Sequence, residues 1–375
     1  MVQKRQDIEK KEKEQLASYA AFSQESKGRV YPQLSHDFRT DFQRDRDRIV
    51  HCTAFRRLEY KTQVFIPHET DHYRTRLTHT IEVAQISRTI ARILRLNEDL
   101  AEAVALVHDL GHTPFGHAGE DVLNELLVNE GGFNHNHQSL RIVDLLEQGY
   151  KEHPGLNLTY EVREGIVKHE TKLKMIHKDF DNNQFPSLEA MIVDIADEIA
   201  YNSHDIDDGL SSGLITFELL ENSESLRNIL NNPQIKFDNS HYSQYSLVRQ
   251  IINNLTIDVI EETNRRIGQN NIKTIDNVRD SKIKLCNYSK SMEIWVKELK
   301  NLLFNNLYRH EKLTNMIQWS REIITSLFDW FNMDTNRLPE RFQEMLLTEK
   351  KSIVIADYIA GMTDRFATKI YGEIK

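Results

Sequence analysis

Residues 105–117 read Ala105-Leu-Val-His-Asp-Leu-Gly-His-Thr-Pro-Phe-Gly-His117, and the interpretation of the whole chain starts from this stretch. An apolar run of helical character ends in the adjacent pair His108-Asp109, and a turn rich in glycine and proline then carries His112 and His117. Imidazole nitrogen suits Zn, Fe, Ni or Mn, whereas a carboxylate moves the preference towards Mg and Mn. Two neighbouring residues do not fill a coordination sphere, so further ligands are expected elsewhere in the chain.

The spacing of apolar residues predicts three helices around this pair. Apolar residues recur close to every 3.6 positions from His79 to Leu96, and a second helix is predicted from Glu98 to Val107. A third helix is predicted to begin after Ser187, a residue type favoured at the N-cap. His79 therefore begins one helix and His108-Asp109 ends the next, so antiparallel packing of the two would bring these side chains together.

The third predicted helix carries polar residues on one stripe, because they recur at spacings of three and four: Asp194, Asp197, Tyr201 and Asp205. His79, His108 and Asp109 with one of these carboxylates give two imidazoles and two carboxylates. Such a set leaves positions open for water and substrate, as catalytic metal sites do. By the residues alone, Asp194 and Asp197 are both candidates for the fourth ligand.

Composition sets the broad class. The chain has 375 residues, of which 39% are hydrophobic and 28% charged, and its few prolines (7) and glycines (14) favour a helical protein. The net charge of -9 gives no overall nucleic-acid footprint, so an anionic substrate would need a local basic pocket. Cys52 and Cys286 give no disulfide framework. The N-terminus is charged and lacks an apolar signal region, and no run is long enough to span a bilayer, so we expect a cytoplasmic protein without membrane contact.

The segmentation predicts an all-α protein in which residues 1–375 form one helical body. Its metal-binding core is expected at about residues 60–210, followed by a helical C-terminal part at about 211–375. Additional helices are predicted over 4–22, 119–129, 142–148, 248–260 and 292–304. Residues 39–57 are rich in arginine, interleaved with aspartate, which is typical of a solvated helix face and less often of a phosphate-binding or subunit-contact segment.

With these residues identified, the sequence resembles the HD-domain metal phosphohydrolases, whose ligand order it repeats as His79, His108-Asp109 and Asp197. Within them it is similar to the deoxynucleoside triphosphate triphosphohydrolases, the bacterial dGTPase-like family. The matching strings extend over nearly the whole chain: Arg-Asp-Arg-Asp-Arg-Ile (44–49), Phe-Arg-Arg-Leu-Glu-Tyr-Lys-Thr-Gln-Val-Phe (55–65), Arg-Thr-Arg-Leu-Thr-His-Thr (74–80), His-Asp-Leu-Gly-His-Thr-Pro-Phe-Gly-His (108–117), Ile-Ala-Asp-Glu-Ile-Ala-Tyr (195–201), Leu-Tyr-Arg-His (307–310) and Asp-Tyr-Ile-Ala-Gly-Met-Thr-Asp-Arg (357–365).

The resemblance implies an all-α HD-domain bundle with additional C-terminal helices. It also implies a reaction in which water attacks the α-phosphorus of a dNTP and releases a deoxynucleoside and intact triphosphate. The fourth metal ligand then falls on Asp197, while Tyr201 faces the phosphates and Asp205 faces the sugar 3′-hydroxyl. The implied cofactor is a divalent ion: Mn or Mg, with Fe, Ni and Zn as alternatives.

Other family positions carry over to this chain as expected catalytic and binding residues. His117 matches the histidine beside the α-phosphate, with Glu120 orienting it, and His135 matches a second active-site histidine. His112 is expected either to join them or to bind triphosphate oxygens. The substrate contacts implied are Gln63 at the 3′-hydroxyl, Val64 against C2′, and Arg76 at a phosphate.

One departure from the family pattern concerns the triphosphate. A related vertebrate enzyme has a lysine directly after the fourth ligand, where this chain has Glu198. Another cation must then neutralise the charge of the triphosphate, and Lys168 and Lys300 are the candidates. Tyr308 is expected to lie against the base or sugar.

The resemblance also implies partners: a dNTP substrate with dGTP among the choices, a homo-oligomer (a hexamer or another even-numbered assembly) and, in some members, a dNTP activator. Residues 39–57 are candidates for the subunit contact or the activator site. Two rival functions stay open. One is another HD phosphohydrolase, such as a nucleotidase or phosphodiesterase. The other is a nucleotide-sensing or single-stranded nucleic-acid-binding protein that keeps the fold.

Overall fold

The structure is a computed structural model, and it describes residues 2–63, 74–169, 177–221, 223 and 241–374. These residues form helices joined by turns and loops, and their only strand-like pairings are two isolated bridges, Arg29 with Thr159 and Thr62 with Thr75. The all-α class predicted from the sequence is confirmed. Within the described ranges, no helix is both long and apolar enough to cross a membrane.

Three helices form the centre of the molecule: α4 (Arg76–Ile93), α5 (Glu98–Val107) and α9 (Leu188–Ser211). Each begins at a side-chain cap, because Thr75, Asn97 and Ser187 accept the backbone N–H of Thr78, Leu100 and Ala190, respectively. Such caps satisfy donors that the first helical turn leaves unpaired. The three helices predicted from apolar spacing are confirmed, and the predicted N-cap Ser187 is among the caps.

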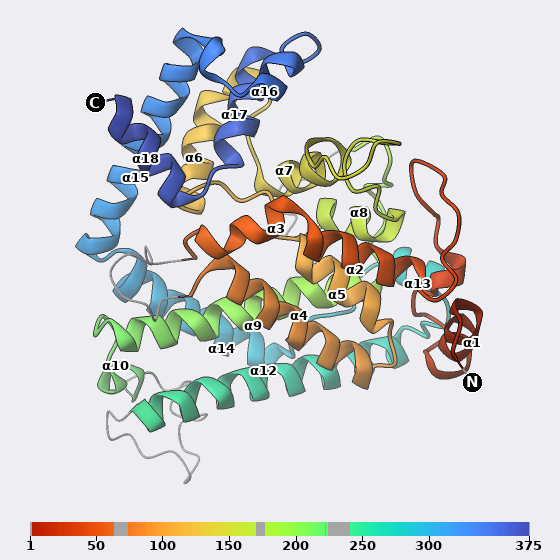
Figure 1. Ribbon diagram of the computed structural model, residues 1–375. Helices are drawn as coiled ribbons and strands as arrows, with labels where there is room; N and C mark the ends of the chain where they lie inside the picture. The colour runs from red at the N-terminus through yellow and green to blue at the C-terminus, as the bar shows by residue number, and fades with distance from the viewer. Residues whose placement is uncertain (1, 64–73, 170–176, 222, 224–240, 375) are drawn as a thin grey trace.

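The remaining helices surround this centre and extend it (Figure 1). Those of the first half are α1 (Arg5–Gln15), α2 (Asp41–His51), α3 (Thr53–Arg57), α6 (His117–Leu126), α7 (His135–Arg141) and α8 (Tyr160–Val167). Those of the second half are α10 (Phe217–Glu221), α12 (His241–Gln269), α13 (Ile275–Arg279), α14 (Lys290–Leu303), α15 (Glu311–Met333), α16 (Glu340–Met345), α17 (Lys351–Ala360) and α18 (Asp364–Ile374).

One predicted helix begins earlier than expected. The sequence predicted a helix over residues 142–148, but α7 already starts at His135, and a π-type turn, Ile142–Leu146, continues it. The reason is the side chain of Asn134, which accepts the backbone N–H groups of both Asn136 and His137 and so starts the helix. This shift places His135 in the first turn of a helix.

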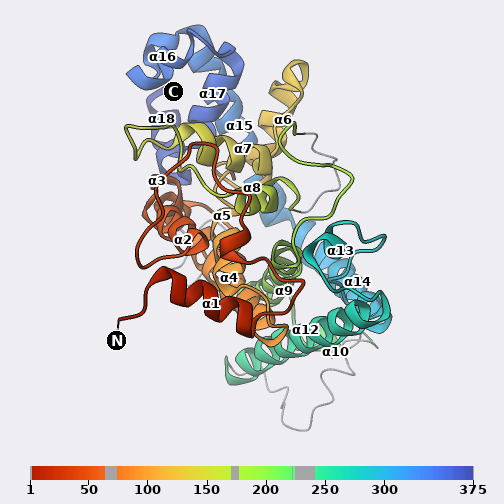
Figure 2. The same ribbon diagram turned by 90° about the vertical axis from the view of Figure 1, so that its right-hand side faces the viewer.

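The apolar side chains form two cores. The larger core contains the inward faces of α4, α5 and α9, and it extends to Leu247 and Leu255 of α12. The second core joins Val122 and Leu123 of α6 to Ile323 of α15 and to the helices that follow it. Figures 1 and 2 show α6 lying beside α15 and α17, away from the central helices. The C-terminal helices therefore pack on a helix from the 60–210 segment.

Most arginines of residues 39–57 bind groups of the protein itself. Arg39, Arg44 and Arg46 form ion pairs with nearby aspartates, including Asp99 of α5. Arg48 donates to the carbonyls of Leu156 and Asn157. Most of these arginines thus bind α2 to neighbouring parts of the protein. Arg57 instead donates to the carbonyl of Gly361 in the C-terminal part.

A buried carboxylate fastens the N-terminal segment to the centre. Glu189, near the start of α9, accepts the backbone N–H of Ala21 at 2.9 Å and that of Asn97 at 3.1 Å. Burial raises the pKa of Glu189, and the two N–H groups oppose that rise. One side chain therefore holds α9, the start of α5 and the chain leading away from α1.

We expect Glu189→Ala to lower the free energy of unfolding by about 1–3 kcal/mol, because it leaves two buried N–H donors without an acceptor. Denaturant unfolding followed by circular dichroism measures this. Glu261→Ala, at an exposed position of α12, is the control and should change stability by less than about 0.5 kcal/mol. Equal effects of the two substitutions would contradict the role of Glu189.

Candidate metal centre

The ends of α4 and α5 and the middle of α9 bring the four predicted metal ligands together. His79 Nε2 lies 2.8 Å from Asp197 Oδ1, and His108 Nε2 lies 3.4 Å from Asp109 Oδ1 and 3.8 Å from Asp197 Oδ1. All four side chains are buried or nearly so. One atom each from His79, His108 and Asp109 falls within 4.8 Å of the others, a spacing at which a single ion could be held.

The hydrogen bond of His108 prepares its ring for a metal. Its Nδ1 donates to the carbonyl of Ala105 at 2.6 Å, so its Nε2 carries the lone pair. That Nε2 is buried and has no hydrogen-bond partner among the described residues. Burial lowers the pKa of His108, which keeps the ring neutral. A neutral imidazole with an unused lone pair that faces two carboxylates fits a divalent cation.

Positive and hydrogen-bonding groups keep Asp109 ionised. Arg76 donates from Nη1 to Asp109 Oδ2 at 2.9 Å, and His112 Nε2 lies 3.1 Å from Asp109 Oδ1. Burial alone would raise the pKa of Asp109, but His108, Arg76 and His112 hold it well below its usual range. The Nε–H of Arg76 is itself buried without a partner among the described residues, so this guanidinium has a donor left for another anion.

The second nitrogen of His79 contacts a histidine that the sequence analysis missed. His79 Nδ1 lies 3.4 Å from His204 Nδ1, and His204 Nε2 contacts Glu82. If Nε2 of His79 binds a metal, its Nδ1 carries the proton and His204 Nδ1 must accept it. His204 Nε2–H then donates to Glu82. A signal existed in the sequence, because His204 follows Asp197 by seven residues and so lies on the same face of α9.

A second missed histidine, His169, lies on the other side of Asp197. Its Nε2 is 3.5 Å from Asp197 Oδ2, and its Nδ1 is 2.8 Å from Asp194 Oδ1. Burial by itself lowers the pKa of His169, but the two carboxylates outweigh burial and raise it well above the ordinary value. Asp194, the alternative fourth ligand, contacts His169, and its Oδ2 lies 3.2 Å from Lys284 Nζ. His169 with His108 and Asp197 forms a further group that could hold an ion.

The four predicted catalytic residues also lie together. The rings of His112 and His135 stack with centroids 4.0 Å apart, and Glu120 lies 2.9 Å from His135 Nδ1 and 3.3 Å from His117 Nδ1. The contact with Glu120 raises the pKa of the exposed His117. Burial and the charge of Arg76 lower the pKa of His112 well below its ordinary value. Within this group, His117 therefore favours the protonated form and His112 the neutral form.

A cavity of about 490 Å³ connects these side chains with the predicted sugar contacts. Its wall includes Gln63, Tyr201, Asp205 and Tyr308. The Tyr308 hydroxyl donates to Asp205 Oδ2, and burial raises the pKa of Asp205 to about 7. The side-chain oxygen of Gln63 is buried without a partner among the described residues. A substrate hydroxyl would find two oxygens here, Gln63 Oε1 and Asp205 Oδ1, to which no residue in the described part of the chain donates.

Two predicted substrate residues, Lys168 and Lys300, are placed differently, and a third cannot be compared. Val64 lies outside the described residues. Lys168 does not line the cavity, because its ammonium donates to Glu164 and to the carbonyl of Gln184, each at 2.9 Å. Lys300 pairs with Glu198 at 3.0 Å, and its ammonium lies 5.3 Å from the ring centre of Tyr201. Lys300 therefore neutralises the residue that departs from the family pattern.

Comparisons with known proteins match most of this chain. The HD domain model matches residues 76–202, and that of the phosphohydrolase-associated domain matches residues 286–373. A deoxyguanosinetriphosphate triphosphohydrolase-like protein of Azoarcus sp. (strain BH72) is 50% identical over 362 residues, which cover 95% of each chain. Proteins with the same description from Geobacter sulfurreducens and Brucella ovis are 47% and 46% identical and are matched over 94% of their own length.

The contact of His79 with His204 predicts an effect on metal affinity. His204→Phe keeps a ring and removes the acceptor, so we expect Mn binding weakened by about 10- to 100-fold. His204→Asn places an oxygen near the position of Nδ1 and should restore most of the affinity. Isothermal titration calorimetry measures both constants. His153→Phe, at a buried histidine that stacks against Tyr31 and Tyr150, is the control. Unchanged affinity in His204→Phe would contradict this role.

Proposed function

Because the chain belongs to the HD-domain family of deoxyguanosinetriphosphate triphosphohydrolase-like proteins, we propose that it hydrolyses deoxynucleoside triphosphates, dGTP among them. The products would be the deoxynucleoside and intact inorganic triphosphate. The supporting observation is the cluster of His79, His108, Asp109 and Asp197, of which all but His108 line a cavity. The wall of the same cavity includes His117, Gln63 and Asp205.

A divalent ion would be held by His79, His108, Asp109 and Asp197. The lone pair of His108 Nε2 and the ionised carboxylates fit such an ion. Carboxylates beside imidazoles favour Mn or Mg, while Fe, Ni and Zn also accept this donor set. When bound, the ion would polarise a phosphoryl oxygen and lower the pKa of a bound water towards roughly 7.

Arg76 and His117 would meet the charge of the substrate. The protein is acidic overall, so a triphosphate must find its cations locally. Arg76 carries a buried N–H that no described residue accepts, and His117 faces the same cavity with a raised pKa. Preorganised donors of this kind stabilise charge that develops on phosphoryl oxygens. Tyr201, which lines the cavity, and the neutral His112 would complete the phosphate contacts.

His117 would protonate the leaving 5′-oxygen. Its ring is exposed to the cavity, and Glu120 both raises its pKa and orients it. Glu120 also contacts His135, and the His135 ring stacks on that of His112. These contacts hold the Glu120 carboxylate in place and so orient the His117 ring. A positioned imidazolium of this kind typically contributes about 10²- to 10⁴-fold to a rate.

Gln63, Asp205 and Tyr308 would recognise the deoxyribose. With a pKa of about 7, Asp205 can accept a hydrogen bond from a 3′-hydroxyl or, when protonated, donate one. The free oxygen of Gln63 would accept from the same sugar. Val64 completes the proposal as the residue against C2′, where it would crowd a ribose hydroxyl.

A homo-oligomer, a dNTP activator and a cytoplasmic location are also part of this proposal. The nearest rival, a nucleotidase or phosphodiesterase of the same fold, differs in its products. The nucleic-acid-binding rival has less support, because the arginines of α2 are engaged with aspartates and carbonyls of the protein itself.

Product analysis tests the proposed reaction. With Mn or Mg, we expect dGTP to give deoxyguanosine and intact triphosphate on ion-exchange chromatography, and GTP to react much more slowly. Asp109→Asn should abolish turnover because it removes a metal ligand, whereas the control His153→Phe should keep it. Release of pyrophosphate with dGMP, or of orthophosphate, would assign the protein to a different HD activity.

Sugar recognition makes a separate prediction. We expect Gln63→Leu to lower kcat/KM for dGTP by about 2- to 12-fold, the value of one neutral hydrogen bond. Gln85→Leu, at an exposed position of α4, is the matched control. Steady-state kinetics measure both, and equal kcat/KM values in the two variants would exclude Gln63 from substrate binding.

A further inference from the structure

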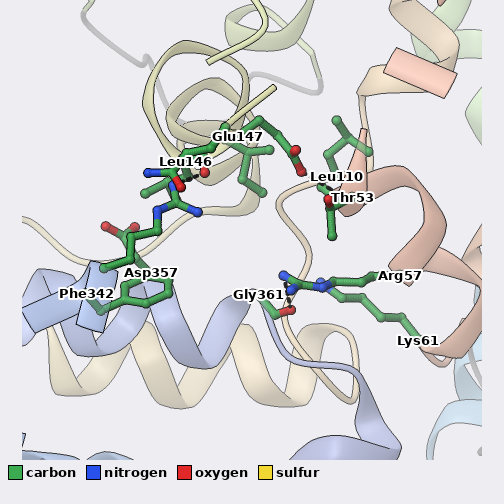
Figure 3. Close-up of a pocket in the computed structure, with 13 residues that line it drawn as sticks. Thr53, Arg57, Lys61, Leu110, Leu146, Glu147, Phe342, Asp357 and Gly361 are labelled. Atoms are coloured by element: carbon green, nitrogen blue, oxygen red, sulfur yellow. Dashed lines mark hydrogen bonds between the residues drawn. The ribbon is translucent and has the colours of Figure 1, made fainter. Parts of the chain in front are cut away.

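A second cavity, of about 290 Å³, lies where α3 and the turn Ile142–Leu146 meet α16 and α17. We call it the seam cavity, and its wall includes Arg57, Lys61, Glu147, Arg341 and Asp357. In Figure 3, Arg57 and Lys61 extend side by side toward Gly361, while Phe342 and Asp357 lie on the opposite side. No residue of this wall lines the cavity of the metal centre.

Three cations of the seam cavity are bonded to carbonyl oxygens alone. Arg57 Nη1 donates to the carbonyl of Gly361 at 3.0 Å, and Arg341 Nη2 donates to that of Leu146. Lys61 Nζ donates to the carbonyls of His112 and Ala360. In the described ranges of the chain, no carboxylate oxygen lies within 4.0 Å of any of these three charges. Their charges are therefore left without a direct counterion.

The two carboxylates of the wall do not neutralise these cations. Asp357 accepts from Arg141 at 2.6 Å and from Gln138 at 3.0 Å, so its charge is already matched. Glu147 accepts the backbone N–H of Ala54 at 2.7 Å. Both Glu147 and, less strongly, Asp357 attract Arg341, but neither forms an ion pair with it. The three cations thus lie beside two carboxylates that are hydrogen-bonded to other groups of the protein.

The clustering of like charges carries an energetic cost. Burial lowers the pKa of Arg341, and the charge of Arg57 lowers it further. Burial lowers the pKa of Lys61 to about 7; the charge of Asp364 opposes that fall, and the charges of Arg76 and Arg57 add to it. Lys61 is buried, whereas Arg341 is half-buried and Arg57 is exposed. A buried charge such as that of Lys61 is normally paired with a group of opposite charge. An anion in the seam cavity would remove this repulsion.

We propose that the seam cavity binds a phosphoryl anion, held by the guanidinium groups of Arg57 and Arg341 with the ammonium of Lys61 at its inner end. Guanidinium groups present paired N–H donors that match the oxygens of a phosphate. When protonated, Lys61 has three N–H groups and uses two on carbonyls, so the residues that the structure describes leave one unused. At roughly 30 Å³ for one water, the volume holds a tetrahedral anion together with several waters.

Two sources supply this chemistry: free orthophosphate, or the inorganic triphosphate that the proposed reaction would release. The binding site itself does not depend on the proposed function, because its residues are separate from the metal centre. The two sources are distinguished by titrating each anion separately into metal-free protein.

The test compares variants by isothermal titration calorimetry, with orthophosphate and then triphosphate as the titrant. We expect the double variant Arg57→Gln/Arg341→Gln to bind about tenfold more weakly or worse, since charge-assisted hydrogen bonds are lost. Arg56→Gln is the matched control, because Arg56 is the sequence neighbour, donates to Thr53 and does not line the cavity. Arg76→Gln removes the cation of the metal centre and should leave this binding unchanged.

Unchanged affinity in the double variant, loss of binding in Arg76→Gln, or no binding at millimolar anion would each overturn the proposal. The single variants Arg57→Gln and Arg341→Gln serve if the double variant unfolds. Crystals of the unmodified protein soaked in tungstate, a heavy phosphate analogue, give a second reading. An anomalous peak between Arg57 and Arg341 supports the site, and a peak at the metal centre alone contradicts it.

Discussion

Two buried carboxylates, Asp109 and Asp197, determine how the centre of this protein must be built. A carboxylate removed from water is unstable unless cations and hydrogen-bond donors surround it. Arg76 and His112 surround Asp109, while His79 and His169 surround Asp197. These partners come from separate helices and turns. Packing α4, α5 and α9 together therefore brings the partners to the two carboxylates, and the contacts with the carboxylates in turn stabilise that packing. The same requirement makes the cluster suitable for a divalent cation, which would supply further positive charge.

A second layer of contacts fixes the orientation of each imidazole. His108 is held by the carbonyl of Ala105, His79 by His204, and His169 by Asp194. Glu82 in turn contacts His204, and Lys284 contacts Asp194. Contacts of this kind select the tautomer and the ring angle of a metal ligand. Polar residues far from the cavity thereby affect the geometry at its wall.

Much of this could be predicted from the sequence, because local patterns determine it. Apolar spacing located α4 and α5, apolar spacing with the N-cap Ser187 located α9, and motif order assembled the four candidate ligands. His169 was missed because its contacts with Asp194 and Asp197 join separate segments of the chain. His204 had the local signal of its spacing from Asp197, but its contact with His79 depends on how α9 packs on α4. Lys168 had a local warning: Glu164 precedes it by four residues, a spacing at which helical ion pairs form. Lys300 had none, because its partner Glu198 is distant in the chain. The early start of α7 depended on one side chain, Asn134, that caps two N–H groups.

Anomalous diffraction from crystals grown with Mn, recorded at the Mn absorption edge, would locate the ion directly. We expect one strong peak bounded by His79 Nε2, His108 Nε2, Asp109 and Asp197. A peak beside His112, His117 and Glu120, which could also hold an ion, would contradict the assignment. So would the absence of manganese from all four predicted ligands.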